Sequence, residues 1–238
     1  MKTDSSPLKD LQHSLENVKG NLHVIEINIP VEKQMEYFRF SEVIRRDNID
    51  NQSVEEQIKV LNSAESSYQE IKYALAFLGI SGNVKAYRAI EAYNAIYSNE
   101  WAALSLMQAK ITLESELSDE RQIFISSGLG GKEDKLRFFA FLKSKERKNF
   151  SDYQKKLIEK EVLYTIQNHL GILEDIKIHD NYFTLLFLIN FQVDIKTMLE
   201  EFIYECNQYG DFINHVFIIT NVRVFSDEEI QNELMGNE

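Results

Sequence analysis

The segment YFTLLFLINF, residues 182–191, has apolar side chains on both faces of a predicted strand. Alternate residues of a strand point to opposite faces of the sheet. The first face carries Phe183, Leu185, Phe187, Ile189 and Phe191, and the second carries Leu186 and Leu188. The helices of a two-layer fold cover one face of a sheet, so the second face needs another cover. We expect that cover to be the helical half of the chain, an early strand and hairpin, or a second subunit.

The elements around this strand follow the order strand, helix, strand, strand, helix, strand. Capping boxes open the first helix at Ser151 and Gln154 and a short terminal helix at Ser226 and Glu229. Strands are expected at 136–142, 172–179, 182–191 and 215–225, and helices between Ser151 and Gly171 and between Asp194 and Gly210. This order predicts a ferredoxin-like antiparallel sheet with two packed helices.

The first half of the chain has mainly helical periodicity. An early strand is expected near 22–29, and helices are expected at 31–46, 83–97 and 99–117. Between Ser53 and Gly79 the pattern fits one long helix, or two helices broken near Ser66, with Tyr68 on the apolar face. A capping-box pattern at Ser53 and Glu56 marks its start. These helices predict a bundle or a short solenoid.

The helical period ends near residue 120. The following sequence, QIFISSGLGGKEDKLRFFAFLKSK at 122–145, has two β-rich runs around a glycine-rich turn and predicts a hairpin. We therefore predict an α+β protein with a mainly helical module at 1–120 and a ferredoxin-like α+β module at 121–238.

The 238-residue chain has a formal net charge of −12, which argues against nonspecific binding to nucleic acid or to an anionic membrane. Residues 132–160 contain ten Lys or Arg against five Asp or Glu, whereas 187–238 contains Lys196 and Arg223 against ten acids. A single cysteine, Cys206, and a polar N-terminus predict a cytoplasmic protein without disulfides or a secretory signal. The apolar runs are shorter than the roughly 20 residues of a membrane-spanning helix.

Five segments carry a resemblance to a known family: ALAFLGISGNVKAYRAIEAY, EWAALSLMQAKITLESEL, FISSGLGGK, ECNQYGDFI and ITNVRVFSDEEI. They look like an uncharacterised bacterial family that joins HEAT-like helices to a ferredoxin-like domain, over about two thirds of the chain. The resemblance implies a HEAT-like N-terminal bundle before the ferredoxin-like module. It implies no activity and no catalytic residue.

Gly128, Gly130 and Gly131 are candidate anion-binding residues, because glycines let backbone N–H groups approach a phosphate that Lys132 could neutralise. A phosphate loop has a longer spacing and leads into a helix, whereas here Glu133 and a strand follow. We predict that the segment is a tight hairpin turn that joins two strands, with anion binding as the alternative.

Asn207, Asp211 and Asn221 lie near the ends of predicted helices and strands, where ACT-like regulatory domains bind small ligands. Asn and Asp at such places more often satisfy loose backbone groups. Phe139 and Phe141 precede a run of lysines and arginines, which could bind RNA on the sheet surface in the manner of an RRM. The RRM glycine between the aromatic residues of the third strand is missing.

The sequence contains no pattern that identifies catalysis. Its five histidines have no neighbouring ligand at metal-binding spacing, and no Ser, His and Asp constellation can be chosen. Cys206 lies on the apolar face of its helix, so a buried, inert thiol is expected. We predict that the protein is not an enzyme and has no metal and no cofactor.

The leading hypothesis is a non-catalytic protein-interaction or regulatory module whose partner is another protein or a second copy of the chain. The alternatives are a small-ligand-sensing, ACT-like domain, and an RNA- or ribosome-associated factor that uses the basic segment 132–160. Nucleic acid is the less favoured partner because of the net charge. A membrane partner is not expected.

Phe202 and Ile203 share the clearest apolar helix face in the chain and are predicted to be core residues. Phe202→Ala should lower the free energy of unfolding by about 3–5 kcal/mol, as truncation of a buried aromatic side chain does. Urea unfolding measures this change. A loss below about 1 kcal/mol would place Phe202 outside the core.

Overall fold

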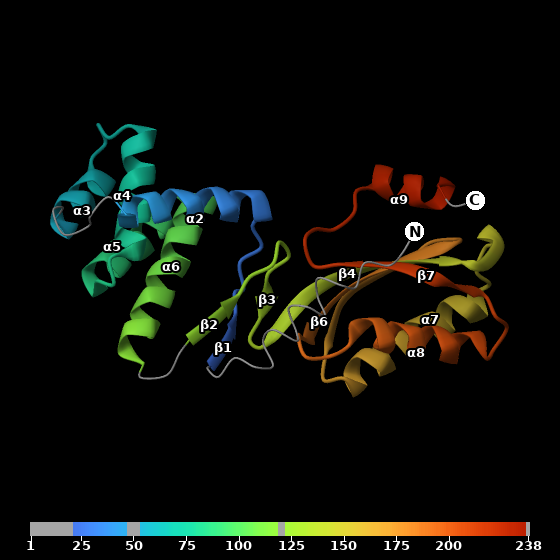
Figure 1. Cartoon of the computed structure of the whole chain (residues 1–238). Helices are drawn as coiled ribbons and strands as arrows, with labels where there is room; N and C mark the ends of the chain where they lie inside the picture. The colour runs from blue at the N-terminus through green and yellow to red at the C-terminus, as the bar shows by residue number, and fades with distance from the viewer. Residues whose placement is uncertain (1–20, 47–52, 119–121, 237–238) are drawn as a thin grey trace. The chain divides into compact units, whose positions relative to one another are not determined.

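The computed structural model describes residues 21–46, 53–118 and 122–236 (Figure 1). The chain divides into two compact units: one is Lys19–Ser126, and the other contains Ser127–Glu238. The first is mainly helical and the second contains an antiparallel sheet, so the fold class is α+β as predicted. Within the described residues, every helix is too short or too polar to span a membrane.

The helical unit packs its helices around one apolar core. The helices are α2 (Val31–Arg46), α3 (Val54–Asn62), α4 (Tyr68–Ile80), α5 (Val84–Ile96) and α6 (Glu100–Leu117). The predicted region after Ser53 therefore forms two helices. The capping box that opens α4 is Ser67 with Glu70, whereas the Ser53 side chain makes no cap hydrogen bond. Tyr37, Phe77, Leu75, Ile90 and Leu104 are fully buried in the core.

A parallel two-stranded ladder belongs to the same unit. β1 (Asn21–Val24) pairs with β2 (Gln122–Ile125), and the N–H of Ile25 donates to the carbonyl of Ile125 at 2.8 Å. The predicted hairpin between the 122–125 run and the next strand is therefore wrong, because β2 pairs with a strand at the other end of the unit. The predicted early strand ends at Val24, and the division between the units falls after Ser126, later than residue 120.

The second unit has the predicted ferredoxin-like sheet. Its elements are β4 (Lys135–Ser144), α7 (Asp152–Asn168), β5 (Ile172–Ile178), β6 (Tyr182–Asn190), α8 (Ile195–Asn207) and β7 (Ile213–Thr220). The strands lie in the order β7, β4, β6, β5, and each neighbouring pair is antiparallel. A two-residue strand, β3 (Gly131–Lys132), pairs with the start of β4.

Helices α7 and α8 cover one face of this sheet (Figure 1). On that face Phe138 pairs across the ladder with Phe187, with ring centroids 6.0 Å apart. Phe202 and Ile203 of α8 are fully buried, so the predicted core face is confirmed. Because successive side chains of a strand point to opposite faces, Phe139, which follows Phe138, lies on the other face of the sheet.

The opposite face lies beneath a short C-terminal helix, α9 (Asp227–Met235) (Figure 1). The buried members of this second cluster are Leu129, Phe139, Phe141 and Ile230, with Tyr182, Leu186, Ile218, Phe225 and Leu234 packed against them. The cover over this cluster is thus a helix of the same unit. It was not among the three covers expected from the sequence.

The glycine-rich segment forms a turn between β2 and β3, in which the N–H of Gly130 donates to the carbonyl of Ser127 at 3.2 Å, but it is not the predicted hairpin turn because β2 and β3 do not pair. The β3–β4 hairpin turns at Glu133 and Asp134, where Glu133 has a φ of 56°. A side chain at Gly128 would lie 1.9 Å from the carbonyl oxygen of Val222. The N–H of Leu129 also donates to the carbonyl of Asn221 at 3.0 Å. Gly128 is needed here because two backbone segments approach too closely for a side chain.

Gly128→Ala should lower the free energy of unfolding by about 2 kcal/mol or more, because overpacking against a rigid backbone typically costs about 1–3 kcal/mol. Lys132→Ala changes an exposed side chain of the same segment and should cost less than about 0.5 kcal/mol. Urea unfolding of the two variants makes the comparison. Equal small losses would mean that the two segments do not approach this closely.

Candidate protein-interaction site

Six aromatic rings and one lysine, contributed by α2, α4, α5 with its C-cap, and α6, lie near one another in the helical unit, and we call them the aromatic belt. Its members are Tyr37, Phe40, Tyr68, Lys72, Tyr93, Tyr97 and Trp101. The Lys72 Nζ lies 3.7 Å from the ring centroid of Trp101 and 5.7 Å from that of Tyr68. The Tyr93 and Tyr97 ring centroids are 4.9 Å apart. Elements far apart in the sequence thus contribute to one surface.

The base of the belt is fixed by polar contacts as well as by burial. The Trp101 Nε1–H donates to the carbonyl oxygen of Lys72 at 3.0 Å, and Trp101 is 8% exposed. The Lys72 Nζ donates to Glu36 at 2.9 Å. Lys72, with Lys33, holds the pKa of Glu36 below its ordinary value. Lys72 is therefore held between two rings and a carboxylate.

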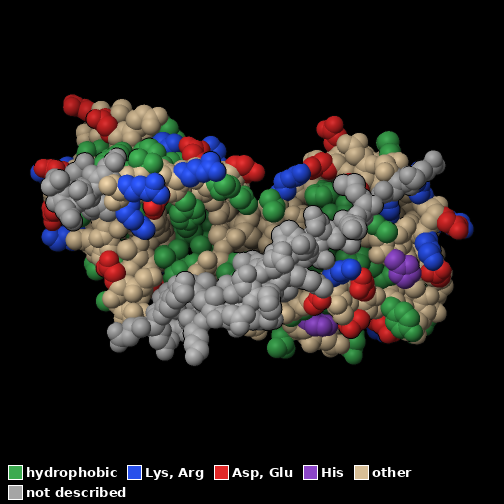
Figure 2. Space-filling model, in the orientation of Figure 1, with side chains coloured by type: hydrophobic (Ala, Val, Ile, Leu, Met, Phe, Trp, Pro, Cys, Tyr) green, Lys and Arg blue, Asp and Glu red, His purple; other side chains and the backbone are tan. Residues whose placement is uncertain are grey.

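The top of the belt is open to solvent. Tyr68 is 69% exposed, Tyr97 is 58% exposed, and the neighbouring Ile96 is 73% exposed. Burial raises the pKa of Tyr93, and the nearby Tyr97 and Tyr68 raise it further. Hydrophobic side chains are visible at the surface of this unit in Figure 2. The prediction that Tyr68 belongs to an apolar core face is wrong, because Tyr68 begins α4 and lies outside the core.

Sequence reasoning missed the belt, although the chain contained a signal for it. The sole tryptophan, Trp101, follows a helix end that carries Tyr93 and Tyr97. Periodicity assigns aromatic residues to a buried face by spacing alone. It cannot show that rings from separate helices meet at the surface.

The seven predicted ligand residues fall into two groups at opposite ends of the β4–β7 ladder. Asn221 lies with the glycine segment at one end, and Asn207 and Asp211 lie at the other. Gly128, Gly130 and Gly131 are buried, whereas Lys132 is exposed. The structure therefore does not bring the seven residues into one site.

In the second group, the side chains of Asn207 and Asp211 bond to other groups of the same chain. The Asn207 Oδ1 accepts from the N–H of Phe212 at 2.9 Å and of Ile213 at 2.8 Å, and its Nδ2 donates to the Ile213 carbonyl at 2.9 Å. Asp211, which has a φ of 47°, forms an ion pair with Lys145. These contacts fix the turn between α8 and β7.

The thiol and metal candidates give no site among the described residues. Cys206 is fully buried, and burial raises the pKa of its thiol to about 12, as expected for an inert cysteine. Within 21–46, 53–118 and 122–236, no group of three His, Cys, Asp or Glu side chains is arranged to hold a metal ion.

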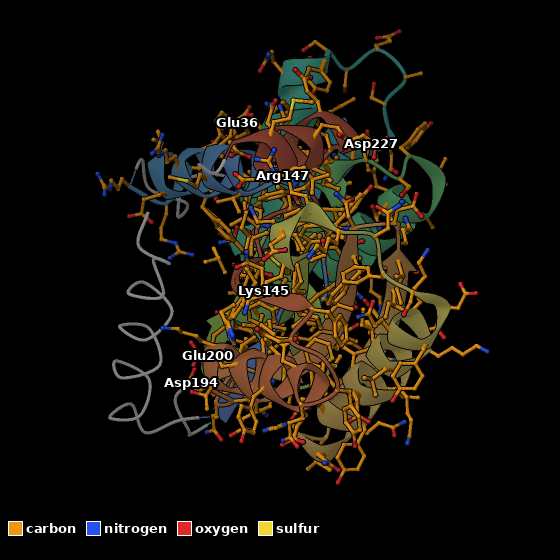
Figure 3. All side chains as sticks on the ribbon, turned by 90° about the vertical axis from the view of Figure 1, so that its right-hand side faces the viewer. Glu36, Lys145, Arg147, Asp194, Glu200 and Asp227 are labelled. Carbon is orange, nitrogen blue, oxygen red and sulfur yellow. The ribbon has the colours of Figure 1, made fainter. Side chains whose placement is uncertain are left out.

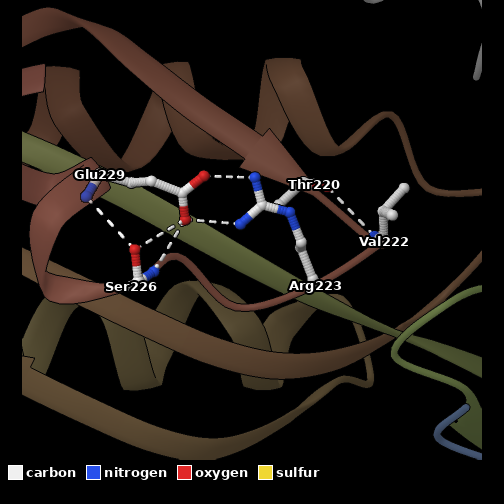
Figure 4. A network of polar contacts seen from close by, with 5 residues as sticks. All are labelled: Thr220, Val222, Arg223, Ser226 and Glu229. Carbon is white, nitrogen blue, oxygen red and sulfur yellow. Dashed lines mark hydrogen bonds and ion pairs between the residues drawn. The ribbon is translucent and has the colours of Figure 1, made fainter. Parts of the chain in front are cut away.

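A polar network fixes the start of α9 (Figure 4). The Arg223 Nη1 donates to the Glu229 Oε2 at 2.5 Å, and its Nη2 donates to the second carboxylate oxygen. The N–H of Ser226 donates to Glu229 at 3.0 Å, which completes the predicted capping box. Arg223, and then Ser226, lower the pKa of Glu229 to about 2.

The Glu229 network should stabilise α9 above pH ~4.3, the ordinary pKa of Glu, and this effect should be lost as the pH falls toward about 2. The sign follows because the pKa is lower in the docked state than in the open state. Hydrogen exchange of the α9 amides, compared between wild type and Glu229→Gln at pH 5 and pH 2.5, measures it. A protection difference that is the same at both pH values would contradict the assignment.

No family model matches the chain, and no curated protein matches it either. Among solved structures, the chain is similar to a REP-associated tyrosine transposase bound to a REP hairpin, at 10% sequence identity and a TM-score of 0.34. The match covers 50% of this chain and 75% of the transposase chain.

Proposed function

We propose that this chain is a non-catalytic protein-interaction module whose helical unit binds a partner protein through the aromatic belt. The observation that supports this function is the exposure of Tyr68 and Tyr97 above a base of buried rings. Tyr and Trp are enriched at the centres of protein interfaces and dominate binding energies there. The belt presents two exposed tyrosines, and Trp101 is buried at its base.

The belt is suited to binding because its exposed rings already have neighbours that limit their movement. The Tyr97 ring packs against Tyr93, and the Tyr68 ring lies near the fixed Lys72 amine. A tyrosine loses little side-chain entropy on binding, since it has two side-chain torsions. Ordering before binding lowers the cost of association further.

The charges beside the belt favour a partner segment that carries Lys or Arg next to apolar side chains. Glu70 lies in the first turn of α4 with Tyr68, and Glu100 precedes Trp101 in the first turn of α6; both are exposed. The Lys72 charge is already paired with Glu36. Acidic groups at the rim of an interface select basic partners. A second copy of this chain, with its net charge of −12, fits that description less well.

The test compares two pairs of tyrosine substitutions in the full chain. Tyr68→Ser with Tyr97→Ser should weaken partner binding at least tenfold, because central interface tyrosines typically contribute about 2 kcal/mol or more. Tyr153→Ser with Tyr164→Ser removes equally exposed rings from α7, at 60% and 61% exposure, and should leave binding unchanged. The partner is isolated with the wild-type chain from its native cells, and each variant is then titrated against it.

Equal binding by both double variants would contradict a role for the belt. Light scattering of the wild-type chain gives a further check. A dimer that the belt substitutions dissociate would make a second copy the partner.

A further inference from the structure

The helix α9 is short and acidic, and its apolar side chains lie on one side. Its sequence, DEEIQNELM, contains Asp227, Glu228, Glu229 and Glu233 and no Lys or Arg. Its apolar residues Ile230 and Leu234 are four positions apart and so share one face, and Phe225 precedes the helix. Asp227 is labelled at the start of this helix in Figure 3. α9 is thus an acidic amphipathic helix with a narrow apolar face.

The sheet face under α9 complements that composition, and we call it the α9 face. It consists of Phe139 and Phe141 of β4, Tyr182 and Leu186 of β6, and Ile218 of β7. The Phe225 ring lies 5.4 Å from that of Phe139. At the edge, the Lys143 Nζ donates to the carbonyl of Glu233 at 3.4 Å, and Arg147 donates to the carbonyl of Met235 at 3.3 Å. Two cations therefore meet the negative end of the helix.

Few contacts hold α9 on this face. Ile230 is the one residue of the nine in α9 that is buried, and Leu234 is partly buried. A helix this short has little stability when separated from its surroundings. In contrast, Phe139 and Phe141, which it covers, are 3% and 2% exposed. Opening of α9 would cost few of its own contacts and would uncover aromatic rings at the centre of the sheet.

We propose that the α9 face is a docking surface for an acidic amphipathic helix of a partner protein, which α9 occupies until the partner displaces it. α9 itself shows the ligand chemistry: an aromatic anchor, two aliphatic residues four positions apart, and acids on the outer side. The basic side chains at the edge would accept the same end of a partner helix. This surface is separate from the aromatic belt and does not depend on it.

Single-stranded nucleic acid is the main rival occupant, since aromatic rings on a sheet can stack with bases. The neighbouring charges argue for a helix instead. Lys145 is paired with Asp211, Lys148 with Glu146, and Arg137 with Glu174. These three cations, on β4 and the segment after it, are therefore paired with carboxylates of the same unit, whereas Lys143 and Arg147 bond to carbonyls of α9.

A fluorescent peptide of residues 222–236, VRVFSDEEIQNELMG, is the probe, and the full-length chain is the receptor. Ile230→Ser with Leu234→Ser removes the apolar anchors of the resident helix. This variant should bind the peptide at least tenfold more tightly than wild type does. Glu228→Ser with Gln231→Ser changes two exposed residues of the same helix and should behave as wild type. Adding Lys143→Glu and Arg147→Glu to the anchor variant should reverse the gain.

Equal, weak binding by all variants, with circular dichroism showing that they are folded, would overturn the proposal. So would binding of a single-stranded DNA oligomer, in place of the peptide, by the anchor variant. A dimer of the wild-type chain that the peptide dissociates would make α9 of a second copy the occupant and would also overturn it.

Hydrogen exchange of the wild-type chain tests displacement even if the anchor variant fails to fold. The α9 amides should open at least tenfold more often than those of β4 and β6. Protection of α9 equal to that of β4 would show that α9 is a permanent part of the fold and would overturn the proposal.

Discussion

The structure of the second unit depends on one constraint: β4 and β6 lie in the middle of the sheet and are apolar on both faces. On one face Phe138 opposes Phe187, and on the other Phe139 opposes Leu186. Neither face can be left to water without exposing large side chains. α7 and α8 cover the first, and α9 lies over part of the second. The loop that contains Leu129 must also reach this cluster, and Gly128 lets its backbone pass Val222.

The fold of the second unit brings together the basic and the acidic segments of the C-terminal half. The basic segment 132–160 and the acidic segment 187–238 are brought together where β4 ends, since Lys145 pairs with Asp211 and Arg147 reaches the end of α9. Ion pairs this exposed contribute little to stability. The direction of α9 is instead favoured by Lys143 and Arg147, which bond to carbonyls near its C-terminal end, because cations are favourable at that end of a helix. In Figure 3, Arg147 lies near α9, whereas Lys145 lies farther from it.

Local sequence signals predicted most of the elements, and long-range pairings were the part that they could not supply. Capping boxes at Ser151 and Ser226 and the periodic face of α8 are readable from neighbouring residues, and each is present. The order of helices and strands then limited the topology enough to give the ferredoxin-like sheet. The partner of β2 had no local signal, because β1 is distant in the chain and pairs in parallel. The hairpin was predicted because neighbouring strands usually pair.

The candidate surfaces were harder to predict for the same reason. Helical spacing assigns a residue to the core whether or not another helix covers it, so Tyr68 could not be distinguished from Leu75, which lies on the same face of α4 and is buried. For the terminal helix α9, the sequence predicted the element but not the surface that it covers. Its capping box predicted where it begins, but its acidic composition gave no hint that it lies on aromatic rings. A more apolar helix would cover the sheet more firmly, yet it would expose more apolar surface whenever it opened. An acidic helix with one buried side chain limits that exposure, and its attachment therefore depends on Ile230, on the partly buried Leu234 and on the two cations at its carbonyl end.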